Sequence, residues 1–263
     1  IRSSTGDVDL AAPSTVLAAQ LHDAYDLVLL GCKAYGLTQA MADIAPAVGP
    51  RTAILPLLNG MRQLELLDEK FGAQHVLGGQ SIISATLDEQ GVVQHLNQAH
   101  SITFGERDGS ASERMQRITS NLTDSGFDAR PSATILQDMW DKWIFLASLA
   151  GITCLLRGSV GSLAAAPGGS AAALALLEEC RAVAEHAGHA PGEATLQRAR
   201  HVLTEAGSTL TASMLRDLQH GHAIEADHVV GDMLARADPQ HAAPVLLSVV
   251  YAHVKVYEAG RMD

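Results

Sequence analysis

The sequence predicts an α/β fold in its first half and an all-helical fold in its second half. Between residues 26 and 130, short apolar runs alternate with helical stretches, an order typical of a parallel sheet covered by helices. After Arg130-Pro131, long helical periods dominate and no strand pattern of useful length appears. We therefore predict two domains, over residues 1–130 and 131–263.

The predicted strands of the first domain are short and mostly apolar. Asp26–Cys32 is typical of a strand buried on both faces. Thr52–Leu58 predicts the next strand, and its internal Pro56 must lie at a sheet edge or near the strand's end. His75–Ala85 predicts another strand, and Gly91–Gly105 predicts two strands of alternating pattern.

The predicted helices are bounded by glycine and proline. In the first domain, Leu37–Val48 shows helical spacing and stops at Gly49-Pro50, and Gln63–Phe71 forms a second helix. The second domain should contain five helices, over Ala133–Leu156, Ser170–Ala187, Glu193–Glu205, Ser213–Ala237 and Ala242–Glu258.

Composition excludes several classes of partner. The chain of 263 residues carries 18 basic and 29 dispersed acidic residues, a net charge of −11, so it has no basic patch for nucleic acid or anionic lipid. The most apolar stretch, Trp143–Leu156, is too short to span a bilayer and predicts a buried helix. The scattered Cys32, Cys154 and Cys180 fit a reducing compartment, so we expect a cytoplasmic protein.

Two polar side chains follow the ends of predicted strands. Lys33 comes after the first apolar run, and Asn59 comes after the second. Open α/β sheets bind ligands beyond the carboxyl ends of their strands, so both residues are candidates for a binding site. The alternatives are a solvated loop lysine and a simple Asn59-Gly60 turn.

Lys142 is a candidate proton donor. In a helix, its neighbours at i−3, i+3 and i+4 are Met139, Phe145 and Leu146, so its ammonium emerges from an apolar stripe. Desolvation lowers the pKa of a lysine and allows it to give up a proton near neutrality. The alternative is a lysine that extends along the edge of the stripe into water.

The twelve histidines do not predict a metal site. His186 and His189 are three residues apart, and His220, His222 and His228 form a second group. A catalytic zinc brings a signature such as HExxH, and none is present, so we expect no metal. A metal hydrolase remains the weakest of the alternative functions. The GxSxG and GxGxxG motifs are also absent.

Five motifs in a fixed order resemble the ketopantoate reductase (2-dehydropantoate 2-reductase) family. They extend from Asp26 to Glu225, which is most of the chain. The motifs are Cys32-Lys33-Ala34-Tyr35, Leu57-Leu58-Asn59-Gly60-Met61, Gly91-Val92-Val93-Gln94-His95, Trp140-Asp141-Lys142, and Ser213-Met214-Leu215-Arg216-Asp217 with Glu225.

This resemblance implies a Rossmann-like NADP-binding domain and a helical substrate domain, which could also form a homodimer. The implied reaction is NADPH-dependent reduction of a 2-keto acid to a 2-hydroxy acid. Lys142 would be the proton donor and Glu225 a second catalytic and cofactor-binding group. By the same resemblance, the cofactor would contact Lys33, Asn59 and Ala85. The substrate would contact Asn59, Lys142 and Ser213.

The structural alternatives for the last two residues are a helix N-cap for Ser213 and an exposed helical acid for Glu225. Ser213 and Glu225 are twelve residues apart, so on one ideal helix their side chains would point about 120° away from each other. They converge only if the helix is interrupted, and His220-Gly221 is the expected place.

The chain departs from the family pattern in two respects. The pyrophosphate-binding GxGxxG unit would precede Ile1, so we expect the first βαβ unit to be missing and NADPH binding by this chain to be poor. Asparagines of the family's helical domain correspond to apolar residues here, which indicates a more apolar 2-keto acid. These positions are Leu146, Ala150, Val160 and Leu210. A non-catalytic binding or structural protein derived from a reductase is the alternative.

Overall fold

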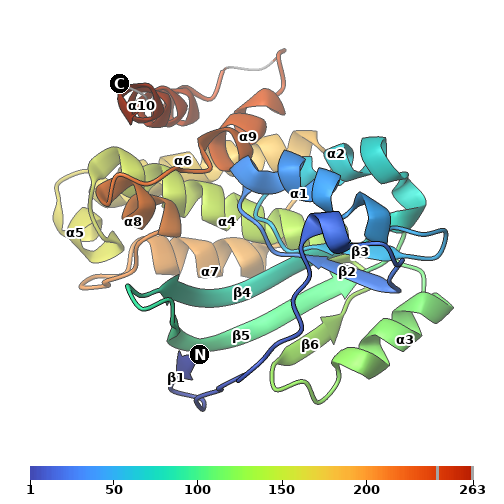
Figure 1. Ribbon diagram of the computed structural model, residues 1–263. Coiled ribbons are helices and arrows are strands. Elements are labelled where there is room, and N and C mark those ends of the chain that lie inside the picture. Colours follow the sequence, from blue (N-terminus) through green and yellow to red (C-terminus); the bar gives the residue numbers. More distant parts are fainter. Residues whose placement is uncertain (241–242, 262–263) are drawn as a thin grey trace. The chain divides into compact units, whose positions relative to one another are not determined.

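The computed structural model describes residues 1–240 and 243–261 (Figure 1). The chain divides into two compact units. The first consists of Ile1–Leu58 and Gln63–Leu136, and the second of Asn59–Arg62 and Gln137–Asp263. A short segment around Asn59 thus belongs with the helical unit, although its neighbours in sequence belong with the sheet.

Two parallel strands begin the α/β core of the first unit. The strands are β2 (Leu27–Leu30) and β3 (Ala53–Pro56), both at predicted positions, and Pro56 ends its strand. All four residues of β3 are buried. However, Leu29 of β2 is 48% exposed, so the prediction that this strand is buried on both faces was wrong. Within the described residues β2 pairs with β3 alone, which leaves it at an edge.

A second sheet has both strand directions, so the prediction of a parallel sheet holds only in part. β4 (Gly78–Leu87) and β5 (Val93–Gly105) are antiparallel, whereas β1 (Arg2–Ser3) and β6 (Asp128–Pro131) run parallel to β5. Two strands were predicted over Gly91–Gly105, but the structure has one. The Asp88 carboxylate accepts hydrogen bonds from the N–H groups of Gln90 (3.0 Å) and Val92 (2.8 Å), which closes the turn before β5 starts.

Helices and short 3₁₀ turns complete the first unit. α1 (Leu37–Asp43) and α2 (Arg62–Phe71) lie where predicted, but Pro46 shortens the first by converting its end to a 3₁₀ turn. α3 (Glu113–Leu122) was not predicted, and its buried Met115 and Ile118 pack into the core beneath the sheet. The 3₁₀ turns are η1 (Ala18–Gln20), η2 (Ala34–Gly36), η3 (Ala45–Ala47) and η4 (Ala73–His75).

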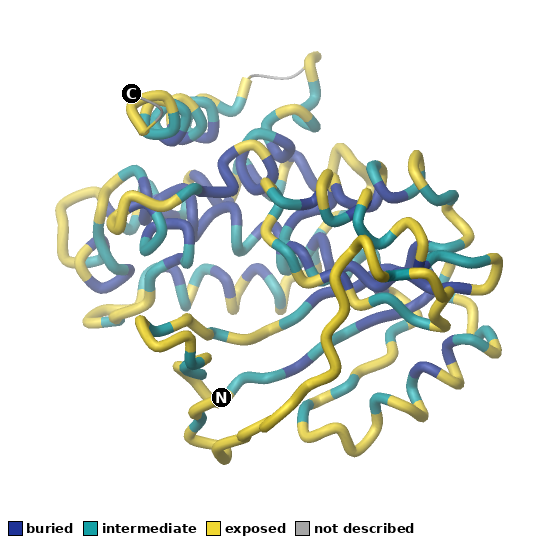
Figure 2. The backbone as a smooth tube through the Cα atoms, in the orientation of Figure 1, coloured by how far each residue is buried: buried dark blue, intermediate teal, exposed yellow. Residues whose placement is uncertain are grey.

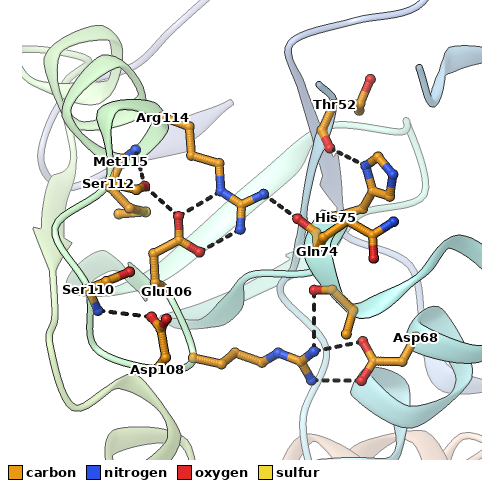
Figure 3. Close-up of polar contacts among 12 residues, drawn as sticks. Thr52, Asp68, Gln74, His75, Glu106, Asp108, Ser110, Ser112, Arg114 and Met115 are labelled. Atoms are coloured by element: carbon orange, nitrogen blue, oxygen red, sulfur yellow. Dashed lines mark hydrogen bonds and ion pairs between the residues drawn. The ribbon is translucent and has the colours of Figure 1, made fainter. Parts of the chain in front are cut away.

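A buried ion pair fixes the loop before α3 (Figure 3). The Glu106 carboxylate accepts hydrogen bonds from Arg114 at 2.6 and 2.5 Å and from the Ser112 hydroxyl at 2.5 Å. The guanidinium of Arg114 is the main reason that the pKa of Glu106 lies below its ordinary value. Nearby, Arg107 donates two hydrogen bonds to Asp68, at 2.9 and 2.8 Å. These contacts tie the loop to the end of α2.

The described part of the second unit is helical, as the sequence predicts. Four predicted helices lie at or near their expected positions, although residue 242, the expected start of the last, falls outside the described residues. The predicted helix Ser213–Ala237 is interrupted, and the short α5 was missed. The elements are α4 (Ile135–Leu156), α5 (Val160–Ala165), α6 (Gly169–His186), α7 (Glu193–Leu203), α8 (Ser213–Gln219), the π-helical turn η5 (Asp227–Gly231), α9 (Asp232–Ala235) and α10 (Val245–Arg261).

α4 is the central helix of this unit. By length and composition alone it could cross a membrane, so the prediction that this apolar stretch is too short to span a bilayer was wrong. However, 67% of its most apolar stretch is buried inside the protein. Figure 2 colours most residues of this helix as buried or intermediate. Even its polar Ser148 and Thr153 are fully buried, and both satisfy their hydroxyls by bonding the carbonyl four residues earlier. α4 therefore has the character of a core helix, as predicted.

Candidate functional site

Lys142 projects from the middle of α4, one residue before the buried Trp143. Burial of its ammonium lowers its pKa from the ordinary value to about 8, because desolvation penalises the charged form. The carboxylate of Glu225 opposes this shift through its charge. A lysine extended into water would not show such a shift, so the structure favours the desolvated alternative.

Glu225 lies just before η5 and is 8% exposed, so it is not the exposed acid of the structural alternative. Its charge acts on both Lys142 and His228. The interruption that brings it there falls where predicted, because α8 ends at Gln219 and Gly221 adopts a φ of +73°. Lys142 and Glu225 are therefore close enough for their charges to interact.

The turn at Asn59-Gly60 packs against η5. Gly60 has a φ of +81°, and a Cβ atom there would lie 2.9 Å from the carbonyl oxygen of His228, so a side chain is excluded. The ring of His228 also hydrogen-bonds to the backbone of Asn59. Asn59-Gly60 thus forms the turn that the sequence offered as the alternative, and this turn lies beside the segment that follows Glu225.

His228 is a buried residue whose part in this region the sequence did not reveal. It is 6% exposed, and burial lowers its pKa, while Glu225 and Asp232 raise it and Arg62 lowers it further. In the sequence, His228 was considered only in a group with His220 and His222, as part of a metal site that was then rejected. In the structure those two are exposed and their rings stack 5.8 Å apart.

Contacts of the Trp143 indole connect α4 to η5 and to the segment that follows it. The indole of Trp143 donates a hydrogen bond of 2.9 Å to the carbonyl of Val229. The Arg236 guanidinium lies 5.8 Å from the Trp143 ring centre and donates to Asp232 at 3.1 Å. The i,i+4 spacing of Asp232 and Arg236 was a signal that could have indicated this pair.

No group of metal ligands is formed within the described part of the chain. His189 stacks on Trp140 with ring centres 5.2 Å apart, and His186 lies 3.4 Å from a carboxylate oxygen of Asp238. These contacts account for two of the histidines that the sequence offered as ligands.

Ser213 is the first residue of α8, and Ala212 is the N-cap. The N-cap alternative for Ser213 is therefore wrong. The backbone N–H of Val160 donates to the Leu210 carbonyl at 2.9 Å, which brings together two of the apolar positions noted above. The other two, Leu146 and Ala150, follow Lys142 by four and eight residues, hence along one face of α4.

Lys33 and Ala85 belong to the first unit, whereas Asn59, Lys142, Ser213 and Glu225 belong to the second. Lys33 is exposed in an extended conformation directly before η2, three residues after β2 ends. Ala85 is exposed beside an irregularity of β4.

The observed architecture is that of a Rossmann-like domain followed by a helical C-terminal domain. Residues 1–109 match the model of the ketopantoate reductase PanE/ApbA family, and residues 134–258 match the model of its C-terminal domain. The chain therefore belongs to the ketopantoate reductase family of oxidoreductases.

Known relatives agree with this assignment. An uncharacterized oxidoreductase of Bacillus subtilis, YkpB, is 31% identical over 99% of this chain and 86% of its own length. The crystal structure of 2-dehydropantoate 2-reductase from Methylococcus capsulatus superimposes with a TM-score of 0.81 at 23% identity, covering 94% of this chain and 78% of that one. D-mandelate dehydrogenase with NADH and anilino(oxo)acetate gives a TM-score of 0.81 at 18% identity, covering 94% and 81%. At these identities the two structures show a shared fold.

Proposed function

We propose that this protein reduces a 2-keto acid to a 2-hydroxy acid with NADPH, and that Lys142 donates the proton. The observation that carries the proposal is the partly buried Lys142 of α4, whose pKa desolvation lowers to about 8 while the charge of Glu225 opposes the shift. A pKa near 8 leaves the group charged at neutral pH yet able to give up its proton.

The chemistry requires one cation at a developing oxyanion. The reduced nicotinamide, when bound, supplies a hydride to the keto carbon. Electron density then moves to the keto oxygen, where the Lys142 ammonium stabilises the charge and donates the proton that completes the hydroxyl group. Glu225 keeps the lysine charged, and Ser213 binds the substrate carboxylate. Asn59 binds both substrate and cofactor from its turn beside His228.

The residues of the first unit fit a dinucleotide. Lys33 places an exposed cation after the carboxyl end of β2, where a phosphate or ribose of a dinucleotide lies in open sheets. Gln80 on β4 is 8% exposed, and its Oε1 atom has no hydrogen-bond partner among the described residues. Lys33, Ala85 and Glu225 would hold the cofactor. The use of NADPH in place of NADH follows from the family resemblance.

The substrate is a 2-keto acid with an apolar side chain or ketopantoate itself. An apolar preference is supported by Leu146, Ala150, Val160 and Leu210, which offer no side-chain hydrogen bond to a substrate hydroxyl. A site without such groups binds hydroxylated and apolar substrates with little discrimination, or prefers the apolar one. Assaying a series of 2-keto acids with and without a side-chain hydroxyl distinguishes an apolar substrate from ketopantoate.

The direct test is the Lys142→Gln variant of the full-length protein. We expect NADPH-dependent reduction to fall by about 10²- to 10⁴-fold, because one positioned acid contributes about that much. The dissociation constant of NADPH should change little. Lys70→Gln, at an exposed lysine near the end of α2, is the matched control and should leave both quantities unchanged. Turnover at the wild-type rate in Lys142→Gln would remove Lys142 from the role. Failure of the unaltered protein to bind any nicotinamide dinucleotide would favour a non-catalytic protein.

A further inference from the structure

Gln80 is a buried amide with an unused acceptor. It is 8% exposed, and Oε1 has no hydrogen-bond partner among the described residues. Gln63, by comparison, is fully buried and has a partner. A buried acceptor without a donor carries a desolvation cost that a ligand with an N–H or O–H group would remove.

The position of Gln80 is at the carboxyl edge of the parallel strands. Ile54 of β3 bridges to Val76 in parallel, and a Cβ atom at Gly79 would lie 2.7 Å from the carbonyl oxygen of Pro56. Pro56 ends β3 and pairs with Leu30, which ends β2. Gln80 therefore comes directly after the level at which both strands end, which is where open α/β sheets bind their ligands.

Two glycines before Gln80 bring the backbone of β4 close to its neighbours. A Cβ at Gly78 would lie 2.7 Å from the side chain of Ile135, and one at Gly79 would lie 2.3 Å from that of Leu55. Neither position has room for a side chain. Gln80 is thus the first residue after Leu77 whose side chain can reach out from this strand.

We propose that Gln80 Oε1 accepts a hydrogen bond from the carboxamide N–H₂ of the nicotinamide ring. This inference rests on the proposed function. A primary carboxamide offers an N–H₂ donor to Oε1 and a carbonyl acceptor to the side-chain N–H₂ of Gln80, whereas the carboxylate and ketone of a 2-keto acid offer acceptors only. The contact would hold the nicotinamide ring in one orientation.

The test compares two ligands that differ only in the donor. In the 3-acetylpyridine analogue of NADP⁺, a methyl group replaces the carboxamide N–H₂. We expect the wild-type protein to bind NADP⁺ more tightly than the analogue by about 10-fold or more, because a buried acceptor is left unpaired with the analogue. In Gln80→Met, which keeps the length of the side chain, the affinities for the two ligands should become similar. Binding is measured by calorimetry without turnover.

Thermal unfolding of the ligand-free protein gives an independent readout. Gln80→Met removes an unpaired acceptor, so its melting temperature should rise by a few degrees. Gln63→Met removes a partnered amide and should lower it. A decrease for Gln80→Met comparable to that of Gln63→Met would show that water already satisfies Oε1 and would overturn the proposal.

The outcomes separate this inference from the proposed function. If the wild-type protein binds NADP⁺ and Gln80→Met discriminates against the analogue as strongly as the wild type, the role of Gln80 is wrong and the reductase proposal stands. If the full-length wild-type protein binds neither ligand, both proposals are wrong.

Discussion

The charge on Lys142 should set the pH dependence of reduction. The protonated lysine is the donor, and burial lowers its pKa to about 8. We therefore expect kcat/KM for reduction to be flat below this pH and to fall about tenfold per pH unit above it. The measurement is the initial rate of NADPH oxidation between pH 6 and 10 at saturating cofactor. A rate that stays constant across this range would contradict the assignment.

The Glu225 carboxylate provides the control for that profile. Because its charge raises the pKa of Lys142, Glu225→Gln should move the downward break of the profile to lower pH. A variant that lowers the rate equally at every pH would instead indicate that Glu225 acts on binding alone.

Burying Lys142 should also cost stability. The folded-state pKa is lowered, so the unfolded chain binds more protons between about pH 8 and the ordinary lysine pKa of 10.5, and stability rises with pH in that window. Below the window the full cost is present. Lys142→Met should therefore stabilise the protein at pH 7 by about 1–3 kcal/mol, and the gain should shrink toward pH 10. Urea unfolding at the two pH values measures this, and a destabilised Lys142→Met at pH 7 would contradict it.

The π-helical turn η5 is the element that the sequence could not show. Periodicity placed β2, β3, α2 and the long helices correctly because burial follows the spacing of apolar residues. A π-helical turn does not visibly change the composition of the sequence or the spacing of its apolar residues. Asp227–Gly231 was therefore predicted as part of one continuous helix. Two strands were predicted in place of the single β5, because alternation of apolar and polar residues indicates a strand but does not show where the preceding turn ends.

The same limit applies to the candidate site. Lys142 was predicted from its place in an apolar stripe and from a family motif, whereas Glu225 was predicted from the family motif alone. His228 and Arg236 were missed, because their partners Asn59 and Trp143 come from segments distant in sequence. Only the fold brings such partners together.

His228 should make the helical unit sensitive to acid. Burial lowers its pKa, so the neutral ring is favoured in the folded state. Glu225 and Asp232 favour the charged ring and Arg62 opposes it, but burial outweighs the rest. Stability should consequently be full above the unfolded histidine pKa of about 6.5 and be lost as pH falls toward the lower folded value. His228→Gln should show a smaller loss between pH 7 and 5 in urea unfolding. His201→Gln, at an exposed histidine of α7, should behave like the wild type.

The division into two units gives the whole chain a testable unfolding behaviour. Both tryptophans, Trp140 and Trp143, lie in the second unit, so indole fluorescence reports on that unit alone. Glu106 and Arg114 form an ion pair in the first unit, and the Glu106 side chain of this pair is buried. Removing one member leaves the other charge without its partner, which costs about 2–4 kcal/mol.

Glu106→Ala should therefore move the part of the circular dichroism change that comes from the first unit to lower urea, while the fluorescence midpoint stays within error of the wild type. Glu113→Ala, at a neighbouring acid of α3 that is not in the pair, is the control and should move neither midpoint by much. If both signals shift together in Glu106→Ala, the two units unfold as one cooperative body. The helical unit would then depend on the sheet unit for its stability, and the Lys142–Glu225 pair would be lost whenever the loop before α3 unfolds.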